Sequence, residues 1–382
     1  MEILANLKEL KFKVTLPTKL PECSINEFEA GKMARTGCYV LTYKNNSFGV
    51  SQWVSPKRTR SYPYARVYDT MSKQLRVTII PVVKDEGFNG DRDFVQWDTV
   101  SLMSLLNVFV ILGYYQTAEK NSNYENKITN QVLDYKYLRE QLDSLVDYKS
   151  SALHWNLSQL ENSLQIIKRC KSSYKNISKT LNIKMHSFEG IDKRIEFLKD
   201  NARAFKEYSR SLAASAQDRE LQTTQPKESV IEEKAKITIW NYLGGLYYLT
   251  VDEAVIKKGR LFLIEKKHSK NTLFPSMNDI KDGIIKMILF SNLAETKIGS
   301  KSFNHLSVLG LTSSTFMGCC HNYMTTKNIS NCLEENDFSS KQKKTIFSVF
   351  NEGKQNNFFV FLMDSNRPEY QSKILNYTFF NL

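Results

Sequence analysis

The sequence predicts a mixed α/β (α+β) fold, in which a mixed β-sheet is flanked by helices and a long helical hairpin is inserted. Runs of β-branched and aromatic residues, such as 76–83 and 358–363, are typical of strands. Between them, apolar residues recur at intervals of four and three from Leu153 to Phe205, and proline is absent from 125–215. This spacing predicts long helices with coiled-coil-like seams.

The change of pattern along the chain predicts four regions. Residues 1–124 mix strand and helix signals, and residues 125–215 carry the helical hairpin. A polar linker that contains Pro226 occupies 216–229. Helix and strand signals then alternate through 230–382, which predicts a mixed sheet covered by helices.

The expected elements of the last region follow from hydrophobic periodicity. In chain order they are a helix at 230–242, a β-hairpin at 246–267, a helix at 276–293, a strand at 305–312, a helix at 343–351 and a strand at 358–363.

Composition favours a polyanionic partner. Lysine and arginine exceed aspartate and glutamate by 13 in a chain of 382 residues. Such an excess favours nucleic acid, because basic side chains release counterions from phosphate backbones. The other interpretation is a merely basic protein. The six cysteines lack the spacing of zinc ligands, and no apolar run suits a membrane span or a signal peptide, so we expect free thiols and a cytoplasmic location.

A basic loop at 55–66 is the candidate for DNA recognition in the N-terminal region. Lys57, Arg58, Arg60 and Arg66 are interleaved with tyrosines. Basic side chains contact phosphates, and aromatic rings pack on sugars or bases. A solvated loop is the equally weighted alternative.

The hairpin at 246–267 carries the most informative side chains. If Lys258 and Gly259 form a two-residue turn, Asp252 lies opposite Glu265. Opposed Cβ atoms are about 4.5–5.5 Å apart, so both carboxylates can reach one cation. A three-residue loop with a bulge places Glu253 there instead. We prefer the two-residue turn and Asp252.

Alternation along the second strand places Lys267 on the same face as Glu265. Two carboxylates suit Mg²⁺, which binds oxygen ligands and keeps several waters. A bound metal activates water and neutralises charge on a phosphate, and a neighbouring ammonium stabilises the charge that develops. The pattern therefore predicts a metal-dependent nuclease site. The alternative is a set of solubilising charges on an exposed hairpin.

Residues 228–312 resemble the PD-(D/E)xK nuclease superfamily, most closely its type II restriction endonucleases. The family pattern maps onto Asp252, Glu265 and Lys267, with Val251 in place of the usual proline. The resemblance implies a restriction-endonuclease-like sheet and Mg²⁺-dependent hydrolysis of double-stranded DNA at a specific sequence. It also implies a homodimer and a separate protective DNA methyltransferase. No GxxxxGK[ST] motif is present to bind ATP.

The same resemblance implies further site residues. The helix before the hairpin is expected to add a metal-binding acid, for which Glu232 and Glu233 are the candidates, with Glu233 favoured; the alternative is a capped, solvated first turn. Lys270 and Lys281, with Asn278, are candidates for contacts to DNA phosphates. Two other functions remain open: a structure-specific repair or phage nuclease with the same core, and a non-catalytic DNA-binding or scaffold protein that acts through its helical hairpin.

Overall fold

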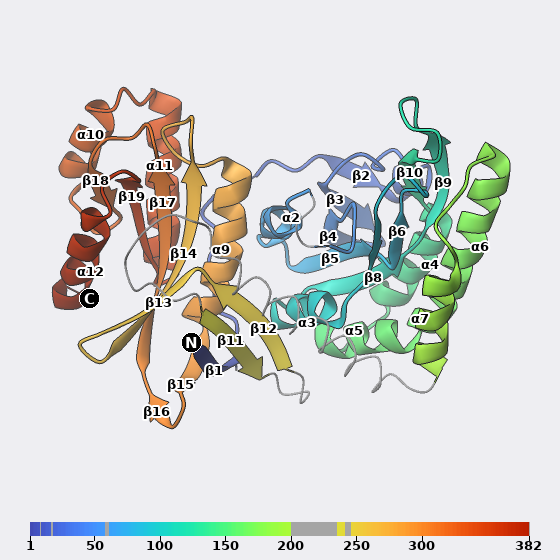
Figure 1. Ribbon diagram of the computed structural model, residues 1–382, viewed down its shortest axis with the longest axis horizontal. Helices are drawn as coiled ribbons and strands as arrows, with labels where there is room; N and C mark the ends of the chain where they lie inside the picture. The colour runs from blue at the N-terminus through green and yellow to red at the C-terminus, as the bar shows by residue number, and fades with distance from the viewer. Residues whose placement is uncertain (8, 17, 58–60, 200–234, 241–245, 382) are drawn as a thin grey trace. The chain divides into compact units, whose positions relative to one another are not determined.

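The computed structural model describes residues 1–7, 9–16, 18–57, 61–199, 235–240 and 246–381. They form two compact units (Figure 1): unit 1 combines Met1–Pro17 with Gln217–Leu382, and unit 2 spans Thr18–Ala216. Both units contain sheets and helices, which confirms the mixed class. No helix in these residues is both long and apolar enough to cross a lipid bilayer.

Unit 1 is built on two five-stranded sheets. Its elements are β1 (Glu2–Leu7), β11 (Ala235–Trp240), β12 (Leu246–Val251), β13 (Glu253–Lys257), β14 (Arg260–Ser269), α9 (Met277–Ser291), β15 (Leu293–Ile298), β16 (Lys301–Ser302), β17 (Asn304–Ser313), β18 (Cys319–His321), α10 (Thr326–Glu334), α11 (Ser340–Gln355), β19 (Phe359–Asp364) and α12 (Glu369–Asn381). One sheet has the order β12-β11-β1-β15-β16, and the other has the order β13-β14-β17-β19-β18.

The second sheet positions the candidate site. Strands β14, β17 and β19 are parallel, and β13 is antiparallel to β14. Helix α9 packs on β14 and β17 (Figure 1). On the opposite face, Phe262 and Ile264 of β14 pack in a core with Ile374 and Leu375 of α12. Successive β14 side chains therefore enter two different interfaces.

Two expected elements of this unit are wrong. The expected helix at 230–242 is strand β11 over the residues described, because Ile237 and Ile239 enter the core of a sheet. The expected hairpin at 246–267 is also divided, since β12 pairs with β11 and only β13 pairs with β14. By contrast, the expected helix at 276–293 and the strands at 305–312 and 358–363 are confirmed.

The N-terminal strand belongs to unit 1 rather than to the expected region 1–124. Strand β1 lies between β11 and β15. The segment after it is held by two amide side chains, one at the C-terminal end of α9 and one at that of α11. Asn292 bonds the backbone N–H and C=O of Lys11, and Asn356 does the same for Lys13, with distances of 2.6–2.9 Å. These long-range contacts explain why the N-terminus joins the C-terminal half.

Unit 2 contains a five-stranded sheet of order β2-β3-β4-β5-β8, two small two-stranded sheets and a series of helices. Its elements are β2 (Glu22–Ser24), α1 (Ile25–Glu29), β3 (Cys38–Tyr43), β4 (Asn46–Gln52), α2 (Pro63–Thr70), β5 (Leu75–Pro81), β6 (Val83–Asp85), β7 (Arg92–Phe94), α3 (Trp97–Leu105), β8 (Phe109–Gly113), β9 (Tyr115–Lys120), β10 (Ile128–Leu133), α4 (Tyr135–Val146), α5 (Ala152–Glu161), α6 (Ser163–Leu181) and α7 (Glu189–Lys199).

The region at 125–215 differs from the expected long helical hairpin. It opens with strand β10, and the described helices pack against the sheets of unit 2: α5 contacts β8, and α6 contacts β9. The apolar stripe that predicted a coiled-coil seam instead covers a sheet, as the burial of Ile167 and Tyr174 shows. Apolar spacing identifies the buried face of a helix but not its partner. The expected linker at 216–229 lies outside the described residues.

Removal of one of the two amide side chains that hold the segment after β1 should destabilise unit 1. In Asn356→Ala, the backbone N–H and C=O of Lys13 lose their partner in a part-buried place. An unsatisfied buried polar group costs about 1–3 kcal/mol, so we expect the free energy of unfolding to fall by about that amount in urea denaturation. The exposed Asn328 of α10 supplies the control, and Asn328→Ala should change it by less than about 0.5 kcal/mol. An equal fall in the free energy of unfolding in both variants would contradict the stabilising role of these two hydrogen bonds.

Candidate metal-binding and catalytic site

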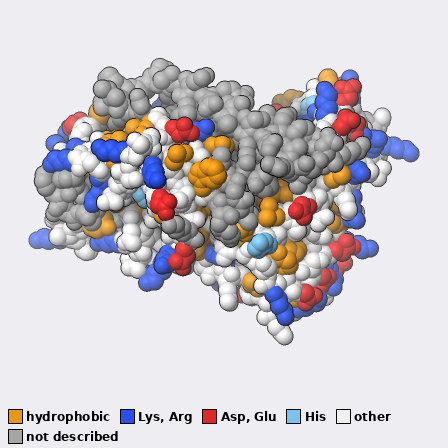
Figure 2. Space-filling model, turned by 90° about the horizontal axis from the view of Figure 1, so that it is seen from below, with side chains coloured by type: hydrophobic (Ala, Val, Ile, Leu, Met, Phe, Trp, Pro, Cys, Tyr) orange, Lys and Arg blue, Asp and Glu red, His pale blue; other side chains and the backbone are white. Residues whose placement is uncertain are grey.

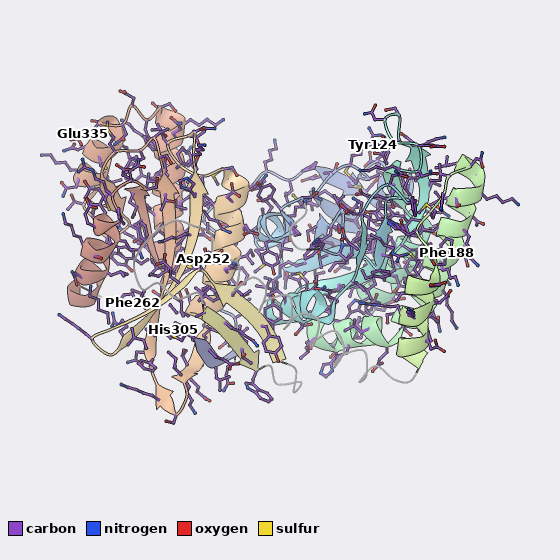
Figure 3. All side chains as sticks on the ribbon, in the orientation of Figure 1. Tyr124, Phe188, Asp252, Phe262, His305 and Glu335 are labelled. Atoms are coloured by element: carbon purple, nitrogen blue, oxygen red, sulfur yellow. The ribbon has the colours of Figure 1, made fainter. Side chains whose placement is uncertain are left out.

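The chain passes from one sheet of unit 1 into the other at Asp252 (Figure 3). Asp252 forms a bend between β12 and β13. Lys257 pairs with Arg260 across the turn, whose two residues, Lys258 and Gly259, have φ angles of 47° and 80°. Two positive φ values are those of a type I′ turn. The expected two-residue turn is confirmed, and the ladder that starts at it ends with the pair Glu253–Ile264, so that Asp252 and Glu265 are the next residues on the two segments.

The alternative acid, Glu253, lies on the other face of the hairpin. It pairs with Ile264, whose side chain enters the core against α12. Its carboxylate forms an ion pair with Lys266 and accepts a hydrogen bond of 2.5 Å from Gln371 of α12. The structure therefore separates Glu253 and Lys266 from the face of Glu265 and Lys267.

Glu265 is the centre of the cluster. Its side chain is 2% exposed, and its Oε1 lies 2.7 Å from Nζ of Lys286 and 3.1 Å from Nζ of Lys267. The other oxygen, Oε2, is buried and has no hydrogen-bond partner among the residues described. A buried carboxylate oxygen without a partner is costly and indicates a place for a further ligand.

Lys267 links the strand to the helix. Its Nζ lies 2.7 Å from Oδ2 of Asp282 on α9 as well as 3.1 Å from Glu265. The side chain passes Gly283, where an added Cβ would lie 3.3 Å from Cε of Lys267 and 2.7 Å from Cδ1 of Leu309. The glycine therefore allows α9 to approach the sheet closely enough for these ion pairs.

Asp252 is positioned through the backbone. Its Oδ2 accepts a hydrogen bond of 2.8 Å from the N–H of Lys266, the residue that follows Glu265. The negative charge of Asp252 interacts with both Glu265 and Lys286 and raises the pKa of each. The two carboxylates predicted to act together are thus electrostatically coupled.

Burial and charge act in opposite directions on these groups. Burial raises the pKa of Glu265 above its usual value, and Asp252 adds to the rise, while Lys286 and Lys267 oppose it. Burial alone lowers the pKa of each lysine, but the neighbouring carboxylates outweigh it and raise the pKa of both Lys267 and Lys286. Both lysines are therefore ammonium ions at neutral pH.

The charges and donors of the cluster fit one divalent cation. Three acids (Asp252, Glu265 and Asp282) meet two lysines, which leaves one negative charge to be compensated. Within the described part of the chain, no three His, Cys, Asp or Glu side chains gather into a metal site by themselves. Mg²⁺ does not require such a cage, because it keeps several waters and uses one or two carboxylates. Asp252 and Oε2 of Glu265 would supply these.

The sequence did not indicate two members of the cluster, Asp282 and Lys286. The resemblance favoured Asn278 and Lys281 of the same helix. The ion pairs to β14 are instead made by Asp282 and Lys286, which lie one turn apart and nearer the C-terminal end of α9. A signal was present: Lys286 stands between Ile285 and Met287 in an otherwise apolar segment, where a charge needs a buried partner.

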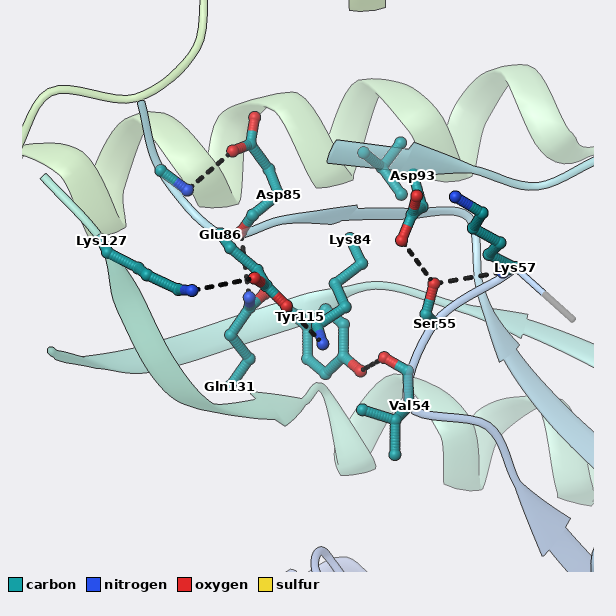
Figure 4. Close-up of polar contacts among 12 residues, drawn as sticks. Val54, Ser55, Lys57, Lys84, Asp85, Glu86, Asp93, Tyr115, Lys127 and Gln131 are labelled. Atoms are coloured by element: carbon teal, nitrogen blue, oxygen red, sulfur yellow. Dashed lines mark hydrogen bonds and ion pairs between the residues drawn. The ribbon is translucent and has the colours of Figure 1, made fainter. Parts of the chain in front are cut away.

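The predicted DNA-contacting residues lie in different places. Lys270 is exposed in the loop after β14, and Lys281 is half-buried on α9. In unit 2, Lys57 is exposed, and its backbone N–H donates to Ser55 Oγ, which itself donates to Asp93 (Figure 4). Arg66 points inward and donates to the carbonyl of Gln52. The remaining predicted residues, Arg58, Arg60 and the metal candidates Glu232 and Glu233, lie outside the described residues.

The excess positive charge does not locate a DNA surface by itself. On the face shown in Figure 2, lysine and arginine side chains are interspersed with acidic ones over the described residues.

Comparison with known proteins adds no assignment. Neither the family models, nor the curated proteins, nor the solved structures contain a significant match to this chain.

Proposed function

We propose that the protein is a Mg²⁺-dependent nuclease whose active site is formed by Asp252, Glu265 and Lys267. The observation that carries this proposal is the pair of electrostatically coupled carboxylates, Asp252 and Glu265, at the end of the β13–β14 hairpin. A buried oxygen of Glu265 has no partner among the described residues, and an ammonium group lies beside the other oxygen. An exposed solubilising hairpin would not bury a carboxylate to 2% exposure and surround it with lysines from two elements.

Each residue of the site has a separate role in this proposal. When bound, Mg²⁺ supplies an activated water and charge neutralisation at the phosphate. Asp252 and Glu265 hold the cation, and the hydrogen bond from Lys266 N–H orients Asp252. Because the neighbouring acids raise the pKa of Lys267, it acts as an ammonium that orients water and stabilises phosphate charge, rather than as a base.

Lys286 has a positioning role in this proposal. It contacts Oε1 of Glu265 and so leaves Oε2 for the cation. Its positive charge also opposes the rise in the pKa of Glu265, which keeps more of that carboxylate ionised at neutral pH. Asp282 has a positioning role for Lys267 in the same way. The Lys267 ammonium contacts both Asp282 and Glu265, and these two contacts limit the movement of the lysine side chain.

The substrate and assembly are part of the same proposal. The order β13, β14, α9, β17 suits the restriction-endonuclease-like sheet that the PD-(D/E)xK pattern implies. We propose double-stranded DNA cut at a specific sequence, with a homodimer for a palindromic site and a separate methyltransferase to protect the host. Digestion of a sequenced plasmid with the purified protein and Mg²⁺, followed by mapping of the cut ends, tests this proposal. Discrete bands indicate a type II restriction endonuclease, whereas cleavage of branched DNA alone indicates a structure-specific nuclease.

Substitutions on the two faces of the hairpin should separate catalysis from structure. Glu265→Gln and Lys267→Met should each lower the single-turnover rate of Mg²⁺-dependent plasmid cleavage by at least about 100-fold. DNA binding in Ca²⁺ should stay within about threefold of wild type. The matched variants Glu253→Gln and Lys266→Met change the same residue types on the opposite face and should keep cleavage within about tenfold at a temperature where they remain folded. Cleavage that survives in both Glu265→Gln and Lys267→Met contradicts the active-site assignment.

The role assigned to Lys286 predicts a change in pH dependence. Cleavage requires ionised Glu265, so the rate falls as pH drops through the pKa of this carboxyl. Lys286→Met removes a charge that lowers this pKa, so the acid limb of the pH–rate profile should move to higher pH. Lys286→Arg keeps the charge and should leave the limb near its original place. An unchanged limb in Lys286→Met, in protein shown to be folded, rules out this role.

A further inference from the structure

Unit 2 contains the same arrangement of strands and helices as the nuclease core of unit 1. In unit 1, an antiparallel hairpin (β13–β14) leads through helix α9 to parallel strand β17, and then through helix α11 to parallel strand β19, with β15 and β16 inserted before β17 and with β18 and α10 inserted before α11. In unit 2, the hairpin β3–β4 leads through α2 to parallel β5, and then through α3 to parallel β8, with β6 and β7 inserted before α3. The order of these strands in the sheets is also the same.

The correspondence extends to register. Both hairpins close with a two-residue turn of positive φ: Lys44-Asn45 at 44° and 61°, and Lys258-Gly259 at 47° and 80°. Counted from these turns, Phe48 corresponds to Phe262. Phe48 pairs with Leu75, and Phe262 pairs with Leu306.

The last strands match as well. Two residues further along β5 and β17, Val77 pairs with Phe109, and Val308 pairs with Phe359. The strands that begin there read Phe-Val-Ile-Leu and Phe-Val-Phe-Leu. Agreement of register at three strand pairs, with similar residues at matched positions, indicates a repeat of one core rather than a shared class.

The repeat preserves the helix-covered face on which the catalytic residues of unit 1 lie. In β14, this face packs on α9, and Gly283 makes the close approach. In β4, the matching face packs on α2, and an added Cβ on Gly49 would lie 2.9–3.0 Å from side-chain atoms of Thr70 and Lys73. Residues at equal distance from the two turns therefore occupy corresponding positions on this face.

The catalytic positions are replaced in unit 2. By the same count, Cys38, Ser51 and Trp53 stand where Asp252, Glu265 and Lys267 stand in unit 1. Ser51 is fully buried and donates to Oγ1 of Thr78 at 2.9 Å. Trp53 is 1% exposed, and Cys38 Sγ lies 3.8 Å from Asp69 on α2. An uncharged hydroxyl, an indole and a thiol cannot replace the carboxylate pair and ammonium that a Mg²⁺ site needs.

Unit 2 instead carries a basic helix. Helix α6 has no acidic residue in its 19 positions. Its inner face is buried, and the exposed side chains include Lys168, Arg169, Lys175 and Lys179. Spacings of seven and four residues place the three lysines on one side of the helix over about 16 Å.

A groove lies beside this helix. It has a volume of about 520 Å³, and its lining includes Tyr114, Gln116, Lys168, Arg169 and Asn176. The acid in the lining, Asp134, accepts a hydrogen bond from the Tyr114 hydroxyl and caps α4. Amide and basic groups are therefore presented together along α6, which suits phosphate oxygens.

We infer that unit 2 is a second copy of the nuclease core that has lost the cutting residues and that holds the backbone of double-stranded DNA along α6. This inference rests on the proposed function in taking DNA as the polyanion. Each chain then has one cutting centre, in unit 1, and cuts one strand in each catalytic event.

The binding test compares two sets of charge removals in the full-length protein. One variant replaces Lys168, Arg169, Lys175 and Lys179 with glutamine. Its matched control replaces the exposed unit 1 lysines 327, 341, 344 and 354, which removes the same charge. Fluorescence anisotropy with a labelled DNA duplex in Ca²⁺ measures affinity over a range of salt. We expect the α6 variant to bind at least about tenfold more weakly, with a salt slope smaller by about 3–4, and the control to change by less than about threefold.

Two results overturn the inference. The first is equal loss of affinity in the α6 variant and its control, or α6-dependent binding to phosphatidylserine vesicles without binding to DNA. The second is a folded Glu265→Gln protein that still nicks supercoiled plasmid and loses this activity when Asp69 of unit 2 is also replaced by asparagine, because a second centre would then lie in unit 2. Failure of the proposed function shows differently: wild type would cut no DNA, or cleavage would survive in both Glu265→Gln and Lys267→Met whether or not Asp69 is replaced. The anisotropy comparison would still decide whether α6 binds DNA.

Discussion

The buried carboxylate of Glu265 is the constraint on which the rest of the site depends. A carboxylate removed from water is stable only when positive charge and hydrogen bonds replace its hydration. Lys267 supplies charge from the same strand and Lys286 supplies it from α9. The helix must therefore pack close to β14, which Gly283 allows. Removal of one partner would leave an uncompensated charge, so the packing of α9 and the electrostatics of the site are a single requirement.

Alternation along β14 makes this arrangement compatible with a stable core. Glu265 and Lys267 face α9, whereas Ile264 and Lys266 face the side of α12. The residues next to Glu265 and Lys267 thus anchor the sheet or pair with Glu253, and the two charge clusters lie on opposite faces of the sheet. The same division exists in unit 2, where the α2-facing positions of β4 hold small or aromatic uncharged residues. The same packing of a helix on a strand is therefore compatible with charged residues in unit 1 and with uncharged residues in unit 2.

Local pattern predicted part of the fold and of the candidate site. The helix at 276–293 and the strands at 305–312 and 358–363 follow from periodicity because their buried faces are strongly apolar. The opposition of Asp252 and Glu265 follows from a two-residue turn and the period of a strand. The pattern failed at 230–242 because an apolar stretch of that length suits either a helix or a buried strand, and the sheet that decides between them includes β1, more than 200 residues earlier.

The sequence by itself determined the turn of the β13–β14 hairpin and which of its side chains share a face, because turn geometry and side-chain alternation act over a few residues. Only the tertiary structure decided which helix charges complete the site, how β1 joins the C-terminal half, and that the apolar stripe of α6 covers a sheet. Pairing between distant segments depends on all the apolar surfaces that must be buried together. A local sequence pattern does not indicate which distant strand or helix a segment packs against. The repeat that we infer in unit 2 is not visible in the sequence for the same reason: strand order and register agree between the two units, while the residues that correspond to Asp252, Glu265 and Lys267 differ.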